Sequence, residues 1–305
     1  MYKKNAVLIY ILSTFLLTWC VWGLVALYQT QLGPYLYQII VAFSMFFPLL
    51  GVLITKKICA GEEISLRLRP NFKGNVKYYL MAWFLPAICT FIGGLVYFLI
   101  FRNFEFENGY FIQLLQPQID SGLITKEMVH TVLVSQMISG IFMAPFFNML
   151  FAFGEEAGWR AFLQSALAKR FSLRKSILLT GLIWGLWHAP IIAMGHNYSF
   201  NYVGYPWLGI FAMCVFCIVV GIFLSYITIK TDSVWPAALA HGALNAIAGI
   251  GFYFVADIES INRFWGPTPW GLVGGIGFIL LAIWCFIKLK RNTNEKVGES
   301  NESVE

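Results

Sequence analysis

Long stretches without a charged residue alternate with short polar segments along most of this chain. The first stretch, Ala6 to Tyr28, is 23 residues long, which is too long for the apolar core of a signal peptide. A membrane-spanning helix needs about 20 apolar residues. By that criterion the sequence predicts eight spans: Ala6–Tyr28, Tyr35–Thr55, Tyr78–Phe101, Val129–Phe153, Ile177–Met194, Leu208–Ile229, Val234–Ala256 and Pro269–Ile287. The predicted fold class is therefore all-α, a polytopic membrane bundle of about eight transmembrane helices.

Basic residues gather on one side of this predicted bundle. If the first span runs from inside to outside, the N-terminus, loops 56–77, 154–176 and 230–233 and the C-terminal segment hold 18 of the 21 Lys and Arg residues. Cytoplasmic loops of membrane proteins are enriched in Lys and Arg. The asymmetry therefore predicts an even number of spans, with both termini in the cytoplasm. Loop 56–77 is also basic enough to contact anionic lipid, and membrane lipid is an expected partner.

The composition is typical of a membrane protein. Hydrophobic residues make up 59% of the 305 residues and charged residues 12%, whereas soluble domains carry roughly 25% charged residues. No concentrated basic stretch interleaved with aromatic residues is present, so we expect no nucleic-acid partner. Residues 1–291 are interpreted as a single membrane domain and residues 292–305 as a disordered polar tail. We expect a multi-pass protein of a bacterial plasma membrane, because the chain is rich in Phe and Trp and has short loops.

Two carboxylates and a guanidinium interrupt an otherwise apolar region in Gly154-Glu155-Glu156-Ala157-Gly158-Trp159-Arg160. Charged side chains in hydrocarbon are costly, and they are retained where they are paired, solvated or functional. Glu156 and Arg160 are four residues apart, so on a helix they share a face and are expected to form an ion pair. Glu155 is left as the carboxylate without a local partner.

The predicted fourth span is longer than one membrane crossing. From Val129 to Ala168 the chain covers 40 residues, whereas about 20 are needed to span a bilayer. Proline disrupts a continuing helix and glycine weakens one. We therefore expect a break near Pro145 or Gly154.

Two of the four histidines lie within predicted spans. His188 lies in the fifth span, and His241 lies in the seventh, four residues before Asn245 and on the same helix face. At 1.5 Å per helical residue, Glu155, His188 and His241 lie about 21, 20 and 14 Å from the nearest cytoplasmic charges. Three spans thus bring polar groups to a comparable level, between the middle of the bilayer and its cytoplasmic side. We expect these groups to converge on one site.

This set of groups suits hydrolysis of a carbonyl compound. A carboxylate can act as general base on a water molecule. Two imidazoles can either bind a divalent metal that acidifies the water or hydrogen-bond the water directly. The amide of Asn245 is a donor suited to a developing oxyanion. The HExxH motif of soluble zinc proteases is absent from the sequence.

In these motifs the sequence resembles the CPBP family (CAAX proteases and bacteriocin-processing enzymes), the type II CAAX prenyl endopeptidase group of intramembrane proteases. That family carries EExxxR, FxxxH and HxxxN or HxxxD, in this order, on separate helices of an eight-helix bundle. The matching segments here are Glu155–Arg160, Trp184–His188 and His241–Asn245, within a motif-bearing part from about 145 to 250. One departure is Trp184, where the family usually has Phe. The substitution keeps an aromatic side chain and is expected to narrow the cavity.

The resemblance implies a CAAX-type intramembrane metalloendopeptidase that acts on a membrane-associated peptide or protein. The catalytic residues that it implies are Glu155, Glu156, Arg160, His188, His241 and Asn245. Glu155 and His188 would activate the water, while His241 and Asn245 would stabilise the oxyanion or help hold a metal. Glu156 and Arg160 would orient the site. Zinc bound by Glu155, His188 and His241 is one alternative, and a metal-free mechanism with Glu155 as the base uses the same residues.

Two functions from other classes are compatible with the same residues. Some bacterial members of this family are linked to bacteriocin self-immunity, so a non-catalytic protein that protects or regulates by binding is the main alternative. A transporter that relays protons through buried Glu and His would be expected to show paired repeats and broken helices in corresponding halves, and the sequence shows no such repeats.

Overall fold

The structure is a computed structural model that describes residues 5–28, 31–59, 65–107, 109–259 and 261–302, and its regular elements are helices. Their bounds are α1 (Ala6–Leu27), α2 (Pro34–Ser44), α3 (Phe47–Ile58), α4 (Val76–Phe101), α5 (Tyr110–Asp120), α6 (Met128–Phe142), α7 (Ala144–Glu156), the π-helix η1 (Ala157–Leu163), α8 (Gln164–Ala168), α9 (Leu173–Trp187), α10 (Ala189–Ala193), α11 (Trp207–Thr231), α12 (Trp235–Ile247), the 3-10 helix η2 (Ile250–Phe254) and α13 (Ile276–Glu302). Strand pairing in the described residues is limited to an isolated bridge between Phe104 and Val255. The predicted all-α class is confirmed.

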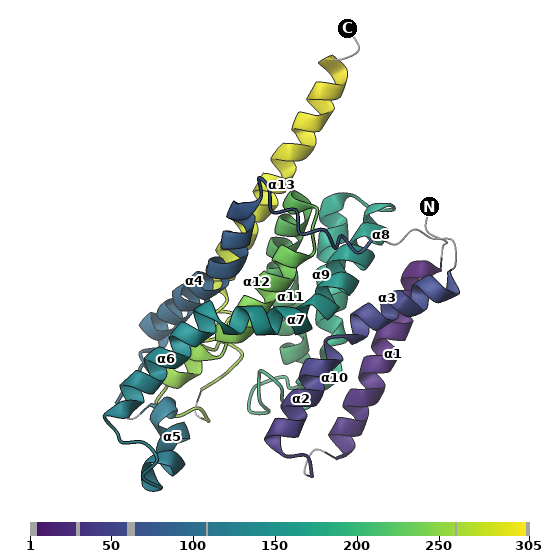
Figure 1. Cartoon of the computed structure of the whole chain (residues 1–305). Helices are drawn as coiled ribbons and strands as arrows, with labels where there is room; N and C mark the ends of the chain where they lie inside the picture. The colour runs from purple at the N-terminus through teal and green to yellow at the C-terminus, as the bar shows by residue number, and fades with distance from the viewer. Residues whose placement is uncertain (1–4, 29–30, 60–64, 108, 260, 303–305) are drawn as a thin grey trace.

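The helices form an elongated bundle with the motif-bearing helices in the middle (Figure 1). α1 pairs with α2 and α3 on one side, and α4, α6 and α13 lie on the other side. α1 begins and α13 ends at the same end of the molecule, where α8 also lies, and α5 lies at the opposite end. The most extensive helix contacts are between α7 and α12 and between α9 and α11. α7 and α12 carry predicted site residues, and His188 directly follows α9.

Glycines allow these central helix pairs to approach backbone to backbone. A Cβ added at Gly242 of α12 would lie 2.5 Å from the backbone nitrogen of Met149 in α7. A Cβ added at Gly185 of α9 would lie 2.4 Å from the Cα of Cys214 in α11. Small residues at such crossings are typical of helix packing in membranes, where close van der Waals contact drives association.

The chain is an integral, multi-pass membrane protein by the length and apolar character of its helices. In the described residues five helices qualify as membrane spans: Ala6–Leu27, Pro34–Ile58, Val76–Phe101, Trp207–Thr231 and Trp235–Phe254. A bent pair of helices makes a sixth if it is counted as one span. The prediction of eight spans differs because two of the predicted segments form shorter regular helices, α9 with 15 residues and the apolar part of α13, Ile276–Leu289.

α9 is shorter than its apolar stretch because the chain turns at His188. The helix ends at Trp187, and α10 begins at Ala189 with Pro190 in its first turn. Proline lacks a backbone N–H and its ring clashes with the preceding turn, so it starts helices but does not continue them. The turn places His188 at the junction of two helices.

The predicted break in the fourth segment is confirmed near Pro145. α6 ends at Phe142 and α7 begins at Ala144, and the two halves of the segment are bent by 47°. Pro145 again lies in the first turn of the new helix. Figure 1 shows that α7 then crosses the bundle instead of running along it. The depth estimated for Glu155 by counting residues along a straight helix is therefore too large.

The segment between α4 and α6, for which the sequence predicts no role, is attached to η2. The backbone N–H of Glu105 donates to the carbonyl of Phe254, and that of Tyr110 donates to the carbonyl of Val255, both at 2.8 Å. The ring of Phe111 in α5 packs against Tyr253 at 4.7 Å between centroids. Glu105 and Tyr110 thus bind the end of the seventh predicted span through backbone hydrogen bonds.

The last helix runs beyond the predicted membrane domain. α13 extends to Glu302, so it enters the stretch 292–305 that the sequence predicts to be a polar tail. The disorder of that tail stays a prediction.

Candidate active site

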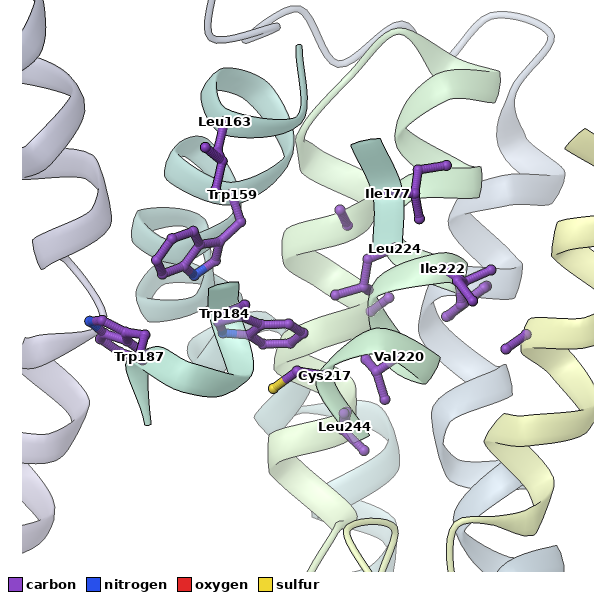
Figure 2. Close-up of a cluster of buried hydrophobic side chains, with 14 of the residues drawn as sticks. Trp159, Leu163, Ile177, Trp184, Trp187, Cys217, Val220, Ile222, Leu224 and Leu244 are labelled. Atoms are coloured by element: carbon purple, nitrogen blue, oxygen red, sulfur yellow. The ribbon is translucent and has the colours of Figure 1, made fainter. Parts of the chain in front are cut away.

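Glu155 lies at the end of α7 with its carboxylate held by two tryptophans. The residue is 3% exposed. Its Oε2 atom accepts hydrogen bonds from the indole Nε1 of Trp184 at 2.6 Å and from that of Trp159 at 3.2 Å. Figure 2 shows these two indoles in one buried cluster with Trp187 and Cys217. Both indole donors go to one carboxylate oxygen, so the carboxylate is held in a defined orientation and Oε1 takes no bond from either ring.

The sequence gives Glu155 no local partner, but the structure gives it two. Trp159 follows Glu155 by four residues, the spacing at which side chains meet on a helix, so this donor could have been found from the sequence. Trp184 comes from α9, 29 residues away. Its contact depends on the packing of α9 against η1 and has no local signal.

The expected ion pair between Glu156 and Arg160 is confirmed, and it is fully buried. The Nη1 atom of Arg160 lies 3.1 Å from Oε1 of Glu156, and both side chains are 0% exposed. The guanidinium also stacks on the ring of Trp184, 4.3 Å from its centroid. Isolated charges in an apolar interior are very costly, whereas a paired and stacked guanidinium is partly compensated. Arg160 therefore lies behind the site, where Nη1 pairs with Glu156 while the buried Nε and Nη2 atoms have no hydrogen-bond partner among the described residues.

His241 joins the same carboxylate. Its Nδ1 atom lies 2.8 Å from Oε1 of Glu156, and because a carboxylate accepts, Nδ1 carries the proton. A hydrogen bond on one ring nitrogen fixes the orientation of the ring and turns the other nitrogen to the opposite side. Oε1 of Glu156 therefore pairs with Arg160 and also orients His241.

His188 is oriented by a backbone carbonyl. Its Nδ1 atom lies 2.9 Å from the carbonyl oxygen of Trp184, so Nδ1 donates and the neutral ring presents Nε2 as an acceptor. The sulfur of Cys217 lies 3.9 Å from the same Nδ1 atom, a neighbour that the sequence did not indicate. The ring of Trp184 lies 6.0 Å from that of His188 and 5.3 Å from that of His241. Trp184 thus contacts Glu155 and both histidines.

The predicted catalytic groups line one cavity of about 640 Å³. Glu155, His188, His241 and Asn245 all face it, so the three sequence motifs converge. Asn245 is exposed and His188 is partly buried. Glu156 and Arg160 lie behind the wall and do not line the cavity described for these residues. The structure therefore separates the six predicted residues into four at the cavity surface and two that support them.

From these groups the cavity extends toward the α5 end of the molecule. Its far walls include Tyr253 of η2, which contacts α5, and Asn197 and Trp270 from loops near that end. Gln38 of α2 and Gln136 of α6 also line it, and both are exposed. The opening therefore lies between α2 and α6, at the level where α12 ends.

The donor geometry does not fit a resident metal ion. Within the described part of the chain, no three His, Cys, Asp or Glu side chains lie close enough together to hold one, whereas structural and catalytic zinc sites need at least three such ligands. Glu155, His188 and His241 share a cavity wall without forming the three-donor set that the sequence allowed for zinc.

The central part of the chain matches a known family. Residues 134–247 match the family model described as type II CAAX prenyl endopeptidase Rce1-like. The CAAX prenyl protease 2 of Methanococcus maripaludis is 24% identical to this chain over 253 residues, which cover 80% of this chain and 84% of that protein. The matched residues 134–247 contain α7, η1, α9 and α12 and therefore all six predicted catalytic residues.

Proposed function

We propose that this chain, which belongs to the Rce1-like type II CAAX prenyl endopeptidase family, is an intramembrane endopeptidase whose general base is Glu155. The observation that carries the proposal is the convergence of Glu155, His188, His241 and Asn245 on one cavity. A buried carboxylate, two imidazoles and an amide from three separate helices have no packing function that requires them to face the same space.

The proposed reaction begins with a water molecule between Glu155 and His188. Oε1 of Glu155 takes a proton from the water while the water oxygen forms a bond to the carbonyl carbon of the peptide. His188, whose Nδ1 is held by the carbonyl of Trp184, accepts a hydrogen bond from the same water through Nε2. The two indole N–H groups on Oε2 keep the carboxylate aimed at the water.

The charge that forms on the carbonyl oxygen needs a donor. Asn245 faces the cavity one helical turn after His241, and its amide N–H can donate to the oxyanion. His241, oriented by Glu156, completes this side of the cavity. Glu155 then returns its proton to the leaving nitrogen as the C–N bond breaks, so the proton count balances and the enzyme is regenerated.

We propose an eight-crossing topology with cytoplasmic termini for residues 1–291. The crossings would be α1, α2–α3, α4, α6–α8, α9–α10, α11, α12–η2 and α13. In support, α8 lies at the end of the molecule where α1 begins and α13 ends (Figure 1), as the basic loops require. Cleavage would occur within the bilayer at the level of Glu155. The sequence predicts a site in the cytoplasmic half of the bilayer, but the cavity extends toward the α5 end, which this topology places on the outer side.

The test is cleavage of membrane-associated peptides by the purified full chain in lipid nanodiscs. Loss of a general base typically lowers the rate about 10²- to 10⁴-fold, so Glu155→Gln and His188→Ala should lose cleavage while keeping the unfolding temperature of the wild type. Leu178→Ala, on α9 ten residues before His188 and with a side chain that is 39% exposed, serves as a control that should cleave normally. Full activity of both Glu155→Gln and His188→Ala would refute the mechanism.

A further inference from the structure

Two sulfur atoms lie beside His188, and the proposed reaction uses neither of them. Met213 and Cys217 are four residues apart on α11, the spacing at which side chains meet on a helix. The sulfur of Cys217 lies 3.7 Å from Sδ of Met213 and 3.9 Å from Nδ1 of His188. A thiol, a thioether and an imidazole are thus adjacent, and the thiol contacts both of the others.

The close crossing of α9 and α11 brings these groups together. A Cβ added at Gly181 of α9 would lie 3.0 Å from the backbone oxygen of Cys217. His188 directly follows α9 and so reaches the surface of α11 beside Cys217. Cys217 is 0% exposed and Met213 is 1% exposed. Met213 and His188 line the catalytic cavity, and the cavity gives a small ion a route to all three donors.

The distances between the donors suit a metal ion. With metal–sulfur and metal–nitrogen bonds of about 2.3 and 2.0 Å, as at zinc, donors in a trigonal plane are separated by about 4.0 Å between two sulfurs and about 3.7 Å between sulfur and nitrogen. The observed separations are 3.7 Å between the sulfurs and 3.9 Å between sulfur and nitrogen. Small rotations of the side chains would therefore bring the donors onto one ion.

The chemistry of the donors favours a soft monovalent ion. Thiolate and thioether sulfur select Cu(I), and imidazole also binds copper. One thiolate neutralises the charge of Cu(I), whereas Zn²⁺ would keep an uncompensated charge that is costly in a buried place. Because one donor is a methionine, the set is consistent with the finding that no three His, Cys, Asp or Glu side chains cluster among the described residues.

We infer that Cys217, Met213 and His188 bind one Cu(I) ion and that the bound ion inhibits hydrolysis. Binding exchanges the thiol proton of Cys217 for the ion, and this proton leaves to solvent. Nδ1 of His188 gives up its proton to coordinate the ion while Nε2 takes one up, so the ring stays neutral. The metal site stands on the donor geometry alone, whereas its inhibitory effect rests on the proposed function.

The inhibition follows from the tautomer of His188. Without the ion, Nδ1 donates to the carbonyl of Trp184 at 2.9 Å, and Nε2 is an acceptor. A neutral imidazole carries one proton, so an ion on Nδ1 places that proton on Nε2. Nε2 then no longer accepts the hydrogen bond from the water molecule between His188 and Glu155. The ion therefore acts on the chemical step.

Binding is tested with Cu(I) itself on the purified full chain in lipid nanodiscs. The ion is kept reduced with ascorbate and offered as its coloured bicinchoninate complex, so transfer to the protein bleaches the solution. The wild type should take up one ion per chain. Cys217→Ser and Met213→Leu each remove one donor and should weaken binding about tenfold or more, because even groups that only support the ligands of a metal contribute about 10- to 100-fold.

Cys285→Ser and Met137→Leu are the matched controls. Cys285, on α13, is 0% exposed as Cys217 is, and Met137 is a half-buried residue of α6. Both variants should bind like the wild type. No uptake by the wild type, or unchanged uptake in Cys217→Ser, would overturn the inference. X-ray absorption at the copper edge should show two sulfur neighbours and one nitrogen, and a site without nitrogen would overturn the role of His188.

The effect on hydrolysis is measured with peptides that the wild type cleaves, and each rate is compared with the metal-free rate of the same variant. One equivalent of Cu(I) should lower the kcat of the wild type about 100-fold, because a positioned acid–base group contributes about 10²- to 10⁴-fold. KM should change little, and excess bicinchoninate should restore kcat. Cys217→Ser and Met213→Leu should resist the same concentration of Cu(I).

The outcomes separate the metal site from the proposed function. Equal inhibition of the wild type, Cys217→Ser and Met213→Leu would overturn the inference, and full kcat in the wild type with the ion bound would refute the inhibition. A wild type that binds the ion but cleaves nothing when metal-free would refute the proposed function and leave the metal site standing.

Discussion

Replacing Trp184 by Phe should slow the chemical step without unfolding the protein. The indole Nε1 of Trp184 donates to Oε2 of Glu155 at 2.6 Å, and phenylalanine has no donor at that position. The aromatic ring that stacks on Arg160 would be retained in part. Trp159, at 3.2 Å from the same oxygen, would then be the remaining indole that orients the carboxylate.

The size of the effect follows from the value of one hydrogen bond to a charged group. Such bonds contribute about 1.5–3 kcal/mol. If the whole contribution is needed to aim Glu155 in the transition state, kcat should fall about 10- to 100-fold, since 1.36 kcal/mol corresponds to a factor of ten. The Michaelis constant should change little, because the lost N–H group orients the base and an aromatic ring remains in the cavity wall at this position.

Trp187→Phe is the matched control for this change. Trp187 is buried to the same extent as Trp184, and its Nε1 donates to the hydroxyl of Thr18 at 2.8 Å, away from Glu155. Both variants lose one indole N–H bond and the same side-chain volume. Steady-state kinetics in nanodiscs, with unfolding temperatures measured in parallel, should show a loss of kcat only for Trp184→Phe. Equal losses in both variants, or full kcat in Trp184→Phe, would refute the role assigned to this bond.

Three further predictions concern the supporting structure. Glu156→Gln leaves the buried guanidinium of Arg160 without its ion-pair partner, so the protein should lose about 3–5 kcal/mol of stability; unchanged denaturant unfolding in detergent would contradict this. Gly242→Ala forces a Cβ to 2.5 Å from the backbone of Met149 and should cost about 1–3 kcal/mol, whereas Gly23→Ala, with open space around it, should leave the unfolding temperature unchanged. Because no three His, Cys, Asp or Glu side chains cluster among the described residues, extensive treatment with a zinc chelator should leave the cleavage rate of the wild type unchanged, and loss of activity that zinc alone restores would show that the donors rearrange around a metal.

Local spacing allowed part of the site to be predicted. The pair Glu156–Arg160 follows from four residues of separation on a helix, and the break near Pro145 follows from the backbone chemistry of proline. The grouping of Glu155, His188 and His241 could be predicted because each is an isolated polar group in an apolar segment, and such groups usually share a site.

The contacts that orient these groups could not be predicted in the same way. The hydrogen bond from Trp184 to Glu155 and the one from His241 to Glu156 join residues 29 and 85 positions apart. They depend on the packing of α9 against η1 and of α12 against α7, which no local sequence pattern indicates. A count of apolar residues could not predict the number of membrane-spanning helices either. The apolar stretch Ile177–Met194, for example, contains a turn at His188 that ends α9 early.

The backbone hydrogen bonds from Glu105 and Tyr110 to the end of η2 have a consequence for chimeras made between related proteins. Tyr253 and Ile250, which belong to η2, line the catalytic cavity, yet their position is held by backbone bonds from a segment almost 150 residues earlier. A chimera in which only the loop 102–128 is replaced by that of a relative would therefore also displace η2 and with it one wall of the catalytic cavity. Replacing the loop together with residues 250–255 would keep the two hydrogen-bonded segments matched.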